Sequence, residues 1–152
     1  MSRRDLIRMT DEEVEEFLQG RHTLNVATFN HDETIHLVAM WYGFLEGDIV
    51  FETFAKSQKV QNLRRDPRIT VLVEDGEEYD VLRGVEIVGT GEIIEDPATV
   101  VDVARDVVRR YHDLKPEDVD AAAEMMANKR VGIRIRRERV VSWDHRKLGG
   151  TY

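Results

Sequence analysis

Short runs of alternating apolar and polar residues, joined by tight turn sequences, are the feature that most constrains the fold of this chain. Such alternation is typical of strands that bury one face. Turn-forming sequences such as Glu46-Gly47-Asp48 and Asp75-Gly76 separate several of the runs. Because most strands follow one another through turns and not through helical crossovers, we predict a mainly β fold, an antiparallel barrel of six or seven strands with short flanking helices. The expected strands cover residues 22–29, 35–44, 49–53, 68–74, 81–95, 131–136 and 140–143.

Helical patterns are few. A T-x-x-E capping box at Thr10 starts a helix that Gly20 ends. A second helix is expected from Ser57 to Arg65, where Asp66-Pro67 forbids its continuation. Two adjacent helices follow late in the chain, and the four expected helices cover residues 10–20, 57–65, 97–111 and 115–126.

The length and composition fit one soluble domain over residues 1–152. A chain of 152 residues buries roughly 70% of the surface that it exposes when unfolded. It has no cysteine, which excludes thiolate metal sites and disulfides, and we expect a cytoplasmic protein. No apolar run approaches the roughly 20 residues of a membrane span, so we expect none.

The charge of the chain argues against a dedicated nucleic-acid binder, because its net charge is −8. Positive charge is nevertheless concentrated in two stretches, residues 56–68 and Lys129 to Arg139. We interpret the second stretch as a solvated face, with nucleic-acid binding as the alternative.

Sequence motifs show no catalytic constellation. None of the five histidines forms an H-x-x-x-H or H-E-x-x-H pair, so we predict no metal site. Haem ligation by His22 or His36 stays open as an alternative. Nucleophile-elbow and Rossmann patterns are absent as well. If the protein is an enzyme, we therefore expect no catalytic side chain and a cofactor that carries the chemistry.

The segment Thr53-Phe54-Ala55-Lys56-Ser57-Gln58-Lys59 is the sharpest chemical signal. It places hydroxyls and lysines between a strand and the N-terminus of a helix, where unpaired N–H groups bind anions such as phosphate. Lysine is unfavourable in the first helical turn unless an anion compensates it. In the alternative interpretation, Ser57 is only an N-cap and the lysines are solvated.

Aromatic and sulfur-containing side chains cluster at Met40, Trp41, Tyr42 and Phe44. Such a cluster suits a flat ring, although a stretch of this kind more often belongs to the core or to a dimer interface.

Several of these segments together resemble a known family. The most specific piece is S-x-K-x-x-N-L-R-R-D-P-R from Ser57 to Arg68, joined by Leu24 to Phe29, Ile35 to Phe44 and the ending Ser142-Trp143. The chain resembles the flavin/deazaflavin split-barrel proteins, similar in fold to pyridoxamine phosphate oxidase, and in particular their branch that uses the deazaflavin coenzyme F420. The resemblance covers nearly the whole chain.

The resemblance implies a split-barrel homodimer with the cofactor in the cleft between the protomers. It implies that Thr53 to Lys59 hold the phosphate, with Lys59 as the family's matching lysine. It also implies that a strand over Val38, Ala39, Met40, Trp41 and Tyr42 lines the ring, mostly through its backbone, with Thr28 beside it. Tyr79 and Trp143 are expected to close the pocket, and Trp41 and Trp143 to contact the substrate.

The resulting hypothesis is an F420-dependent reductase that gives a hydride to a small conjugated substrate, such as a quinone, a tetrapyrrole or an unsaturated carbonyl compound. An FMN-dependent enzyme and a carrier of cofactor or tetrapyrrole without turnover are the alternatives. Oxidation of pyridoxamine phosphate is disfavoured, because the chain has Arg68-Ile69-Thr70-Val71-Leu72-Val73 where the true oxidases have R-x-V-L-L-K.

Overall fold

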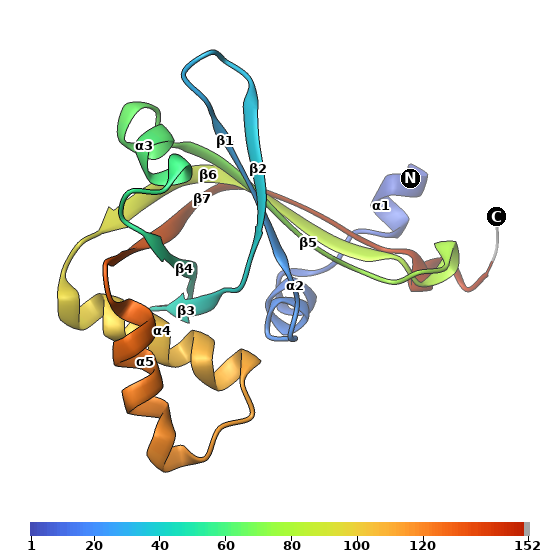
Figure 1. The fold of residues 1–152 in the computed structure, drawn as a ribbon. Helices are drawn as coiled ribbons and strands as arrows, with labels where there is room; N and C mark the ends of the chain where they lie inside the picture. The colour runs from blue at the N-terminus through green and yellow to red at the C-terminus, as the bar shows by residue number, and fades with distance from the viewer. Residues whose placement is uncertain (151–152) are drawn as a thin grey trace.

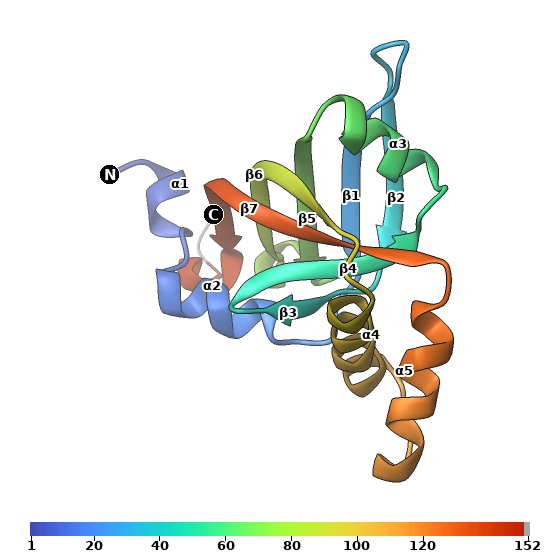
Figure 2. The ribbon, with the colours of Figure 1, turned by 90° about the vertical axis from the view of Figure 1, so that its left-hand side faces the viewer.

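A single antiparallel sheet of seven strands dominates the molecule, as the alternating pattern predicts. The computed structural model describes residues 1–150. The strands follow the order β2-β1-β5-β6-β7-β4-β3, and the sheet curls strongly, so that its two edges approach each other (Figures 1 and 2). The strands are β1 Leu24–Phe29, β2 Ile35–Met40, β3 Gly43–Leu45, β4 Asp48–Phe54, β5 Arg68–Asp75, β6 Arg83–Ile94 and β7 Arg130–Asp144.

The helices lie outside the curled sheet. Helix α3 connects β4 to β5, and the pair α4 and α5 connects β6 to β7 (Figure 1). The predicted capping box at the start of α2 is present, because Thr10 and Glu13 each accept the other's backbone N–H. The sequence patterns did not reveal the short α1 or the 3-10 turns η1 and η3, whereas the expected helix over residues 115–126 covers η2 and all but the last residue of α5. The helical segments are α1 Arg3–Leu6, α2 Asp11–Leu18, α3 Gln58–Arg65, α4 Pro97–Tyr111 and α5 Val119–Ala127, with the 3-10 turns η1 Tyr79–Val81, η2 Pro116–Asp118 and η3 His145–Leu148.

Two expectations about the strands are wrong. Residues 35–44 form not one strand but two, since the chain breaks after Met40 and places β2 and β3 at opposite edges of the sheet. Tertiary contacts impose this break: Tyr42 is fully buried and its hydroxyl donates to the carbonyl of Leu18 at 2.6 Å. Conversely, residues 131–136 and 140–143 belong to one continuous strand, β7, which pairs with β6 along its length around an irregularity at Val88/Gly89.

Strand β2, at one edge of the sheet, faces the end of β4 without pairing with it. Among residues 1–150, strand β2 pairs with β1 alone, and β3 covers β4 only from Asp48 to Val50. The end of β4, residues 51–54, pairs with β7 alone within the described part of the chain. The barrel is therefore split between β2 and the end of β4.

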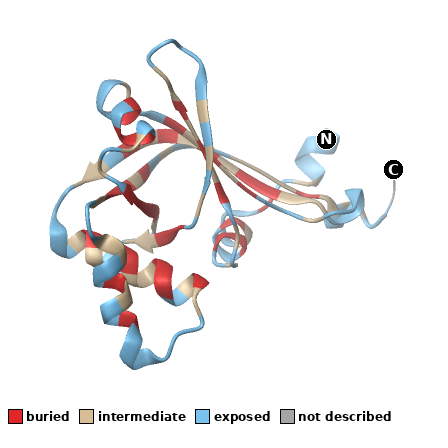
Figure 3. Ribbon diagram, in the orientation of Figure 1, coloured by how far each residue is buried: buried red, intermediate tan, exposed pale blue. Residues whose placement is uncertain are grey.

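Exposed and intermediate residues alternate along β2 (Figure 3), and its outward face carries exposed apolar side chains. Ile35 is 64% and Leu37 69% exposed, while the alternate residues Val38 and Met40 pack against the core. A shallow pocket of about 440 Å³ adjoins this face and is lined by Ala27, Phe29, Ile35 and Val88, among others. None of the helices over residues 1–150 has the length and apolarity needed to cross a membrane.

Candidate functional site

Lys59 lies at the centre of the predicted anion site. It occupies the first turn of α3, yet only 8% of it is exposed. Its Nζ donates to Thr53 Oγ1 at 3.0 Å. Burial lowers the pKa of Lys59, and the nearby positive charge of Arg130 lowers it further. A buried ammonium with a neutral hydroxyl partner retains donor capacity for an anion.

Asn62 fixes the position of this helix on the sheet. It is completely buried one turn after Lys59, and its Nδ2 donates to Thr28 Oγ1 at 3.1 Å and to Asn30 Oδ1 at 3.0 Å. Gln58 Nε2 donates to its Oδ1 at 2.8 Å. These bonds join α3 to β1 and so hold the lysine beside β4.

The N-terminus of α3 is open to a ligand. Ser57 occupies the N-cap position, but neither it nor another side chain among residues 1–150 caps the first turn. The Ser57 hydroxyl instead accepts a hydrogen bond from Thr53 Oγ1 at 3.4 Å. Ser57 is therefore the N-cap residue, as the alternative interpretation had it, but its side chain makes no capping bond, so the first N–H groups of the helix keep their capacity to bind an anion.

His36 faces the same site from β2. It lies opposite Thr28 in the β1–β2 pairing. Its Nδ1 is buried and has no hydrogen-bond partner within residues 1–150. Burial lowers the pKa of His36, and the charge of Lys59 lowers it further. An orphaned ring nitrogen beside a buried lysine fits a group that brings negative charge and hydrogen-bonding oxygens, as a phosphate ester does.

A pocket of about 350 Å³ opens in the split of the barrel. Ala39, Met40 and Trp41 line it at the end of β2. The Trp41 ring stacks on Tyr111 with centroids 5.0 Å apart, and its other neighbour, His112, meets it edge-on at 5.2 Å. The remaining lining residues are Thr23, Glu52, Met126 and Arg130.

Glu52 and Arg130 form an ion pair on the wall of this pocket, in which the carboxylate is buried and the guanidinium is partly exposed. Arg130 Nη1 donates to Glu52 Oε2 at 2.5 Å, and only 7% of the Glu52 side chain is exposed. Burial raises the pKa of Glu52, although the hydrogen bond and charge of Arg130 oppose this rise. The charge of Lys59 lowers the pKa of Glu52 as well, whereas the direct ion pair of Glu52 is with Arg130.

The structure gathers most of the predicted cofactor residues around the split. Thr28 is buried and is bonded to Asn62 of α3. The Thr53 hydroxyl is hydrogen-bonded to both Ser57 and Lys59. Lys56 and Phe54 are exposed beside them, and Ala55 packs partly against the core. Val38 and Ala39 belong to the edge strand β2, which pairs with β1 on one side.

Tyr42 does not present its side chain to the split. It is completely buried, and burial raises the pKa of its hydroxyl, which bonds to Leu18. Its carbonyl accepts from Arg110 Nε at 3.0 Å. Tyr42 is thus a core residue, as the alternative interpretation of the aromatic cluster allowed.

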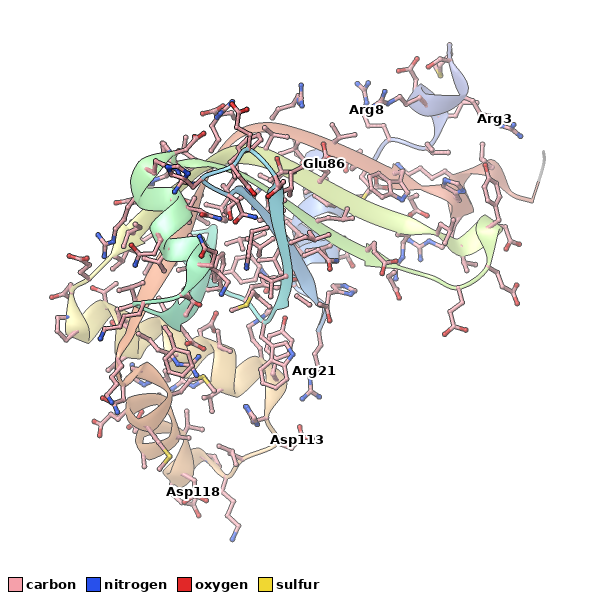
Figure 4. The ribbon with its side chains drawn as sticks, turned by 45° about the horizontal axis from the view of Figure 1, so that its top comes forward. Arg3, Arg8, Arg21, Glu86, Asp113 and Asp118 are labelled. Atoms are coloured by element: carbon pink, nitrogen blue, oxygen red, sulfur yellow. The ribbon has the colours of Figure 1, made fainter. Side chains whose placement is uncertain are left out.

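Tyr79 and Trp143 lie at the other end of the long strands. Trp143 pairs with Gly84, whose missing side chain leaves the space that the indole fills. From Arg130 to Trp143, the length along the curved strand β7 is roughly 40 Å at about 3.3 Å per residue. Tyr79 lies at this distant end too, in contact with His145 at 4.7 Å between ring centroids. In Figure 4, Arg3 and Arg8 mark this end and Asp118 marks the helices at the other. One chain alone does not bring these two aromatics to Lys59.

The basic stretch from Lys129 to Arg139 serves mainly the fold. Four of its six cations form ion pairs: Arg130 with Glu52, Arg134 with Asp48, Arg136 with Glu92 and Arg137 with Glu15. The histidines are dispersed, and residues 1–150 contain no cluster of three or more His, Cys, Asp or Glu side chains suited to a metal ion.

The residues that sequence reasoning missed are Glu52, Asn62, Arg130 and the role of His36 beside Lys59. Glu52 could have been noticed as the one acid among residues 49–54, the otherwise uncharged part of β4. Asn62 stands three residues after Lys59, a spacing that puts both on one helix face. Nothing local indicates that Arg130 reaches β4.

Comparison with known proteins agrees with this architecture. The family described as "Pyridoxamine 5'-phosphate oxidase" matches residues 10–144. A conserved hypothetical protein, Rv2991 from Mycobacterium tuberculosis, is 45% identical with a TM-score of 0.90, covering 100% of this chain and 95% of that one.

Two more distant structures share the fold. One named "F420 Reductase" is 24% identical, with a TM-score of 0.64 over 83% of this chain and 94% of that one. HutZ, the heme storage protein from Vibrio cholerae, is 16% identical, with a TM-score of 0.66 over 87% and 94% of the two chains. No curated protein matches the sequence.

Proposed function

Because this chain belongs to the pyridoxamine 5'-phosphate oxidase family, we propose that it is a reductase that holds coenzyme F420 in the split of its barrel and reduces a small conjugated substrate. The observation that carries the proposal is the buried Lys59 at the uncapped start of α3. The shared fold with a structure named "F420 Reductase" supports the choice of cofactor.

Lys59 and the first N–H groups of α3 would hold the phosphate, while Thr53 and Ser57 orient the lysine. His36 supplies one more nitrogen from the facing strand. The exposed Lys56 lies at the rim, where it would meet the acidic tail that distinguishes F420 from FMN.

The unpaired edge of β2 would lie along the ring. Its backbone groups from Val38 to Met40 are not used by another strand on that side within the described residues, so they can bond to the polar edge of a flat ring. Met40 and Trp41 provide an apolar surface that excludes water. When bound, the reduced deazaflavin would supply the hydride, and the chain's residues supply binding and orientation.

A homodimer completes this proposal. The apolar outward face of β2, with Ile35 and Leu37, would be covered by a second copy. Tyr79 and Trp143, which lie far from Lys59 in their own chain, would then close the site of the other protomer.

The test is a fluorescence titration of the apoprotein with F420 and, in parallel, with FMN. We expect F420 to bind preferentially. Replacing Lys59 by Met should weaken binding by about 10- to 150-fold, or about 1.5–3 kcal/mol for a lost charge-assisted contact. Lys115→Met, at an exposed lysine before α5, is the matched control and should leave affinity unchanged.

Unchanged affinity in Lys59→Met would contradict the phosphate site. Preferential binding of FMN would instead identify a flavin enzyme on the same fold. Binding of F420 without turnover of any quinone, tetrapyrrole or unsaturated carbonyl compound would identify a carrier.

A further inference from the structure

We propose that the pocket beside Trp41 binds the carboxylate end of a planar conjugated molecule and that Arg130 is the residue that recognises it. This inference names the substrate class of the proposed function. It rests on that function for the reaction, but its binding step stands on the pocket alone.

The walls of the pocket suit a flat ring. Trp41 is 46% exposed, and stacking on Tyr111 at an interplanar angle of 12° holds its indole in place. Met40 and Met126 add polarisable side chains, and the volume of about 350 Å³ matches a small organic molecule. A conjugated ring can therefore stack on these walls with little rearrangement.

Arg130 is held in position before any ligand arrives. Glu52 binds its Nη1, and the Phe54 ring lies 4.2 Å from the guanidinium carbon. The side chain is still 25% exposed and lines the pocket. A guanidinium has five N–H donors, so one bond to Glu52 leaves others for a ligand. Fixing the group in advance lowers the entropic cost of binding.

Local charge favours an acid over a neutral carbonyl compound. Arg130 and Lys59 together carry two positive charges and act on the single carboxylate of Glu52. Lys59 does not line the pocket, so a ligand carboxylate would meet Arg130 itself, whose side chain is only 25% exposed there. In such a partly desolvated setting, a bidentate pairing of arginine with carboxylate is strong.

Arg136 lies on the same strand as Arg130 but outside the pocket. It pairs with Glu92 at 2.7 Å and its side chain is 48% exposed. Neither Arg136 nor Glu92 lines the pocket beside Trp41. Arg136→Gln is therefore a matched control for a substitution of Arg130.

The test is an NMR titration with two probes, 2-naphthoate and its neutral amide 2-naphthamide, in the absence of any cofactor. The chain has two tryptophans, so the Trp143→Phe variant assigns the remaining indole N–H signal to Trp41. We expect 2-naphthoate to shift this signal saturably and to bind about tenfold more tightly than the amide. Arg130→Gln should abolish that difference, whereas Arg136→Gln should preserve it.

Arg130→Lys is a second variant for the case that Arg130→Gln fails to fold. It keeps a positive charge beside Glu52 but lacks the planar guanidinium that can bind a carboxylate through two N–H groups. It should reduce the preference for the acid without disturbing the rest of the spectrum. Equal affinity of the parent for both probes would overturn the proposal, as would an unchanged preference in both Arg130 variants. Failure of F420 to bind would leave this result unaffected, so the two proposals fail separately.

Discussion

A lysine in the first turn of a helix destabilises the helix, because its charge opposes the helix dipole. A buried lysine that forms no ion pair with a carboxylate is still more unfavourable. Lys59 combines both conditions, with the Thr53 hydroxyl as its hydrogen-bond partner. The sequence predicted the first condition through the spacing of lysines and hydroxyls. It could not predict the second, because burial of Lys59 depends on the contact of Asn62 with Thr28 on a distant strand.

His36 offers a test of this electrostatic environment. Its pKa is lowered by burial and by Lys59. Below the ordinary histidine pKa of about 6.5, the unfolded chain therefore binds a proton that the folded chain binds less readily. The free energy of unfolding should accordingly fall as the pH drops from about 7 to about 5. His36→Gln should make this dependence flatter, measured by urea unfolding at several pH values.

His31, exposed in the turn before β2, provides the comparison. His31→Gln should retain the slope of the parent protein. If His36→Gln and the parent showed the same slope, the placement of His36 against Lys59 would be wrong.

At the level of elements, local patterns predicted most strands and helices. They did not predict those boundaries that tertiary contacts determine. Residues 35–44 alternate without a visible break, and only the burial of Tyr42 and its bond to Leu18 divide β2 from β3. By contrast, the start of α2 is encoded locally by Thr10 and Glu13, and there sequence and structure agree.

Arg110 of α4 joins three of these elements. Its guanidinium donates to the carbonyls of Tyr42 at 3.0 Å and Gly20 at 3.0 Å, and it lies 5.0 Å from the Phe44 ring. Arg110→Ala should lower the free energy of unfolding by about 2–4 kcal/mol, because it leaves partly buried carbonyls without donors. Urea unfolding monitored by circular dichroism measures the change.

The neighbouring Arg109 is exposed on the same helix and serves as the control, with an expected change within about 0.5 kcal/mol. Equal effects of the two substitutions would mean that Arg110 does not hold α2, β3 and α4 together.

For the whole molecule, the resemblance predicted a split barrel, and the sheet is open between β2 and the end of β4. The same resemblance implied that Tyr79 and Trp143 close the pocket, which the geometry of one chain does not allow. Strand alternation reports which face of a strand is buried, but not which end of a long hairpin meets a ligand. In the proposed homodimer, that second property would depend on how the two chains assemble.

Leu37→Glu tests the assembly. Leu37 is 69% exposed on the outward face of β2. The introduced carboxylate should therefore change the stability of a single chain little, but it should destabilise a dimer whose interface buries this face. We expect the molar mass from light scattering to halve and F420 affinity to fall, with Lys59 untouched. Leu114→Glu, at a 43% exposed leucine after α4, should change neither. A dimeric Leu37→Glu protein would place the interface elsewhere.

The split also affects how the protein is handled. Two strand edges that face each other unpaired can accept backbone hydrogen bonds from other chains, and an exposed apolar edge strand such as β2 is prone to intermolecular pairing and aggregation. A flat molecule inserted between β2 and β4 would shield both edges. Yield and shelf life of the purified protein should therefore depend on whether its ligand is present from synthesis onward.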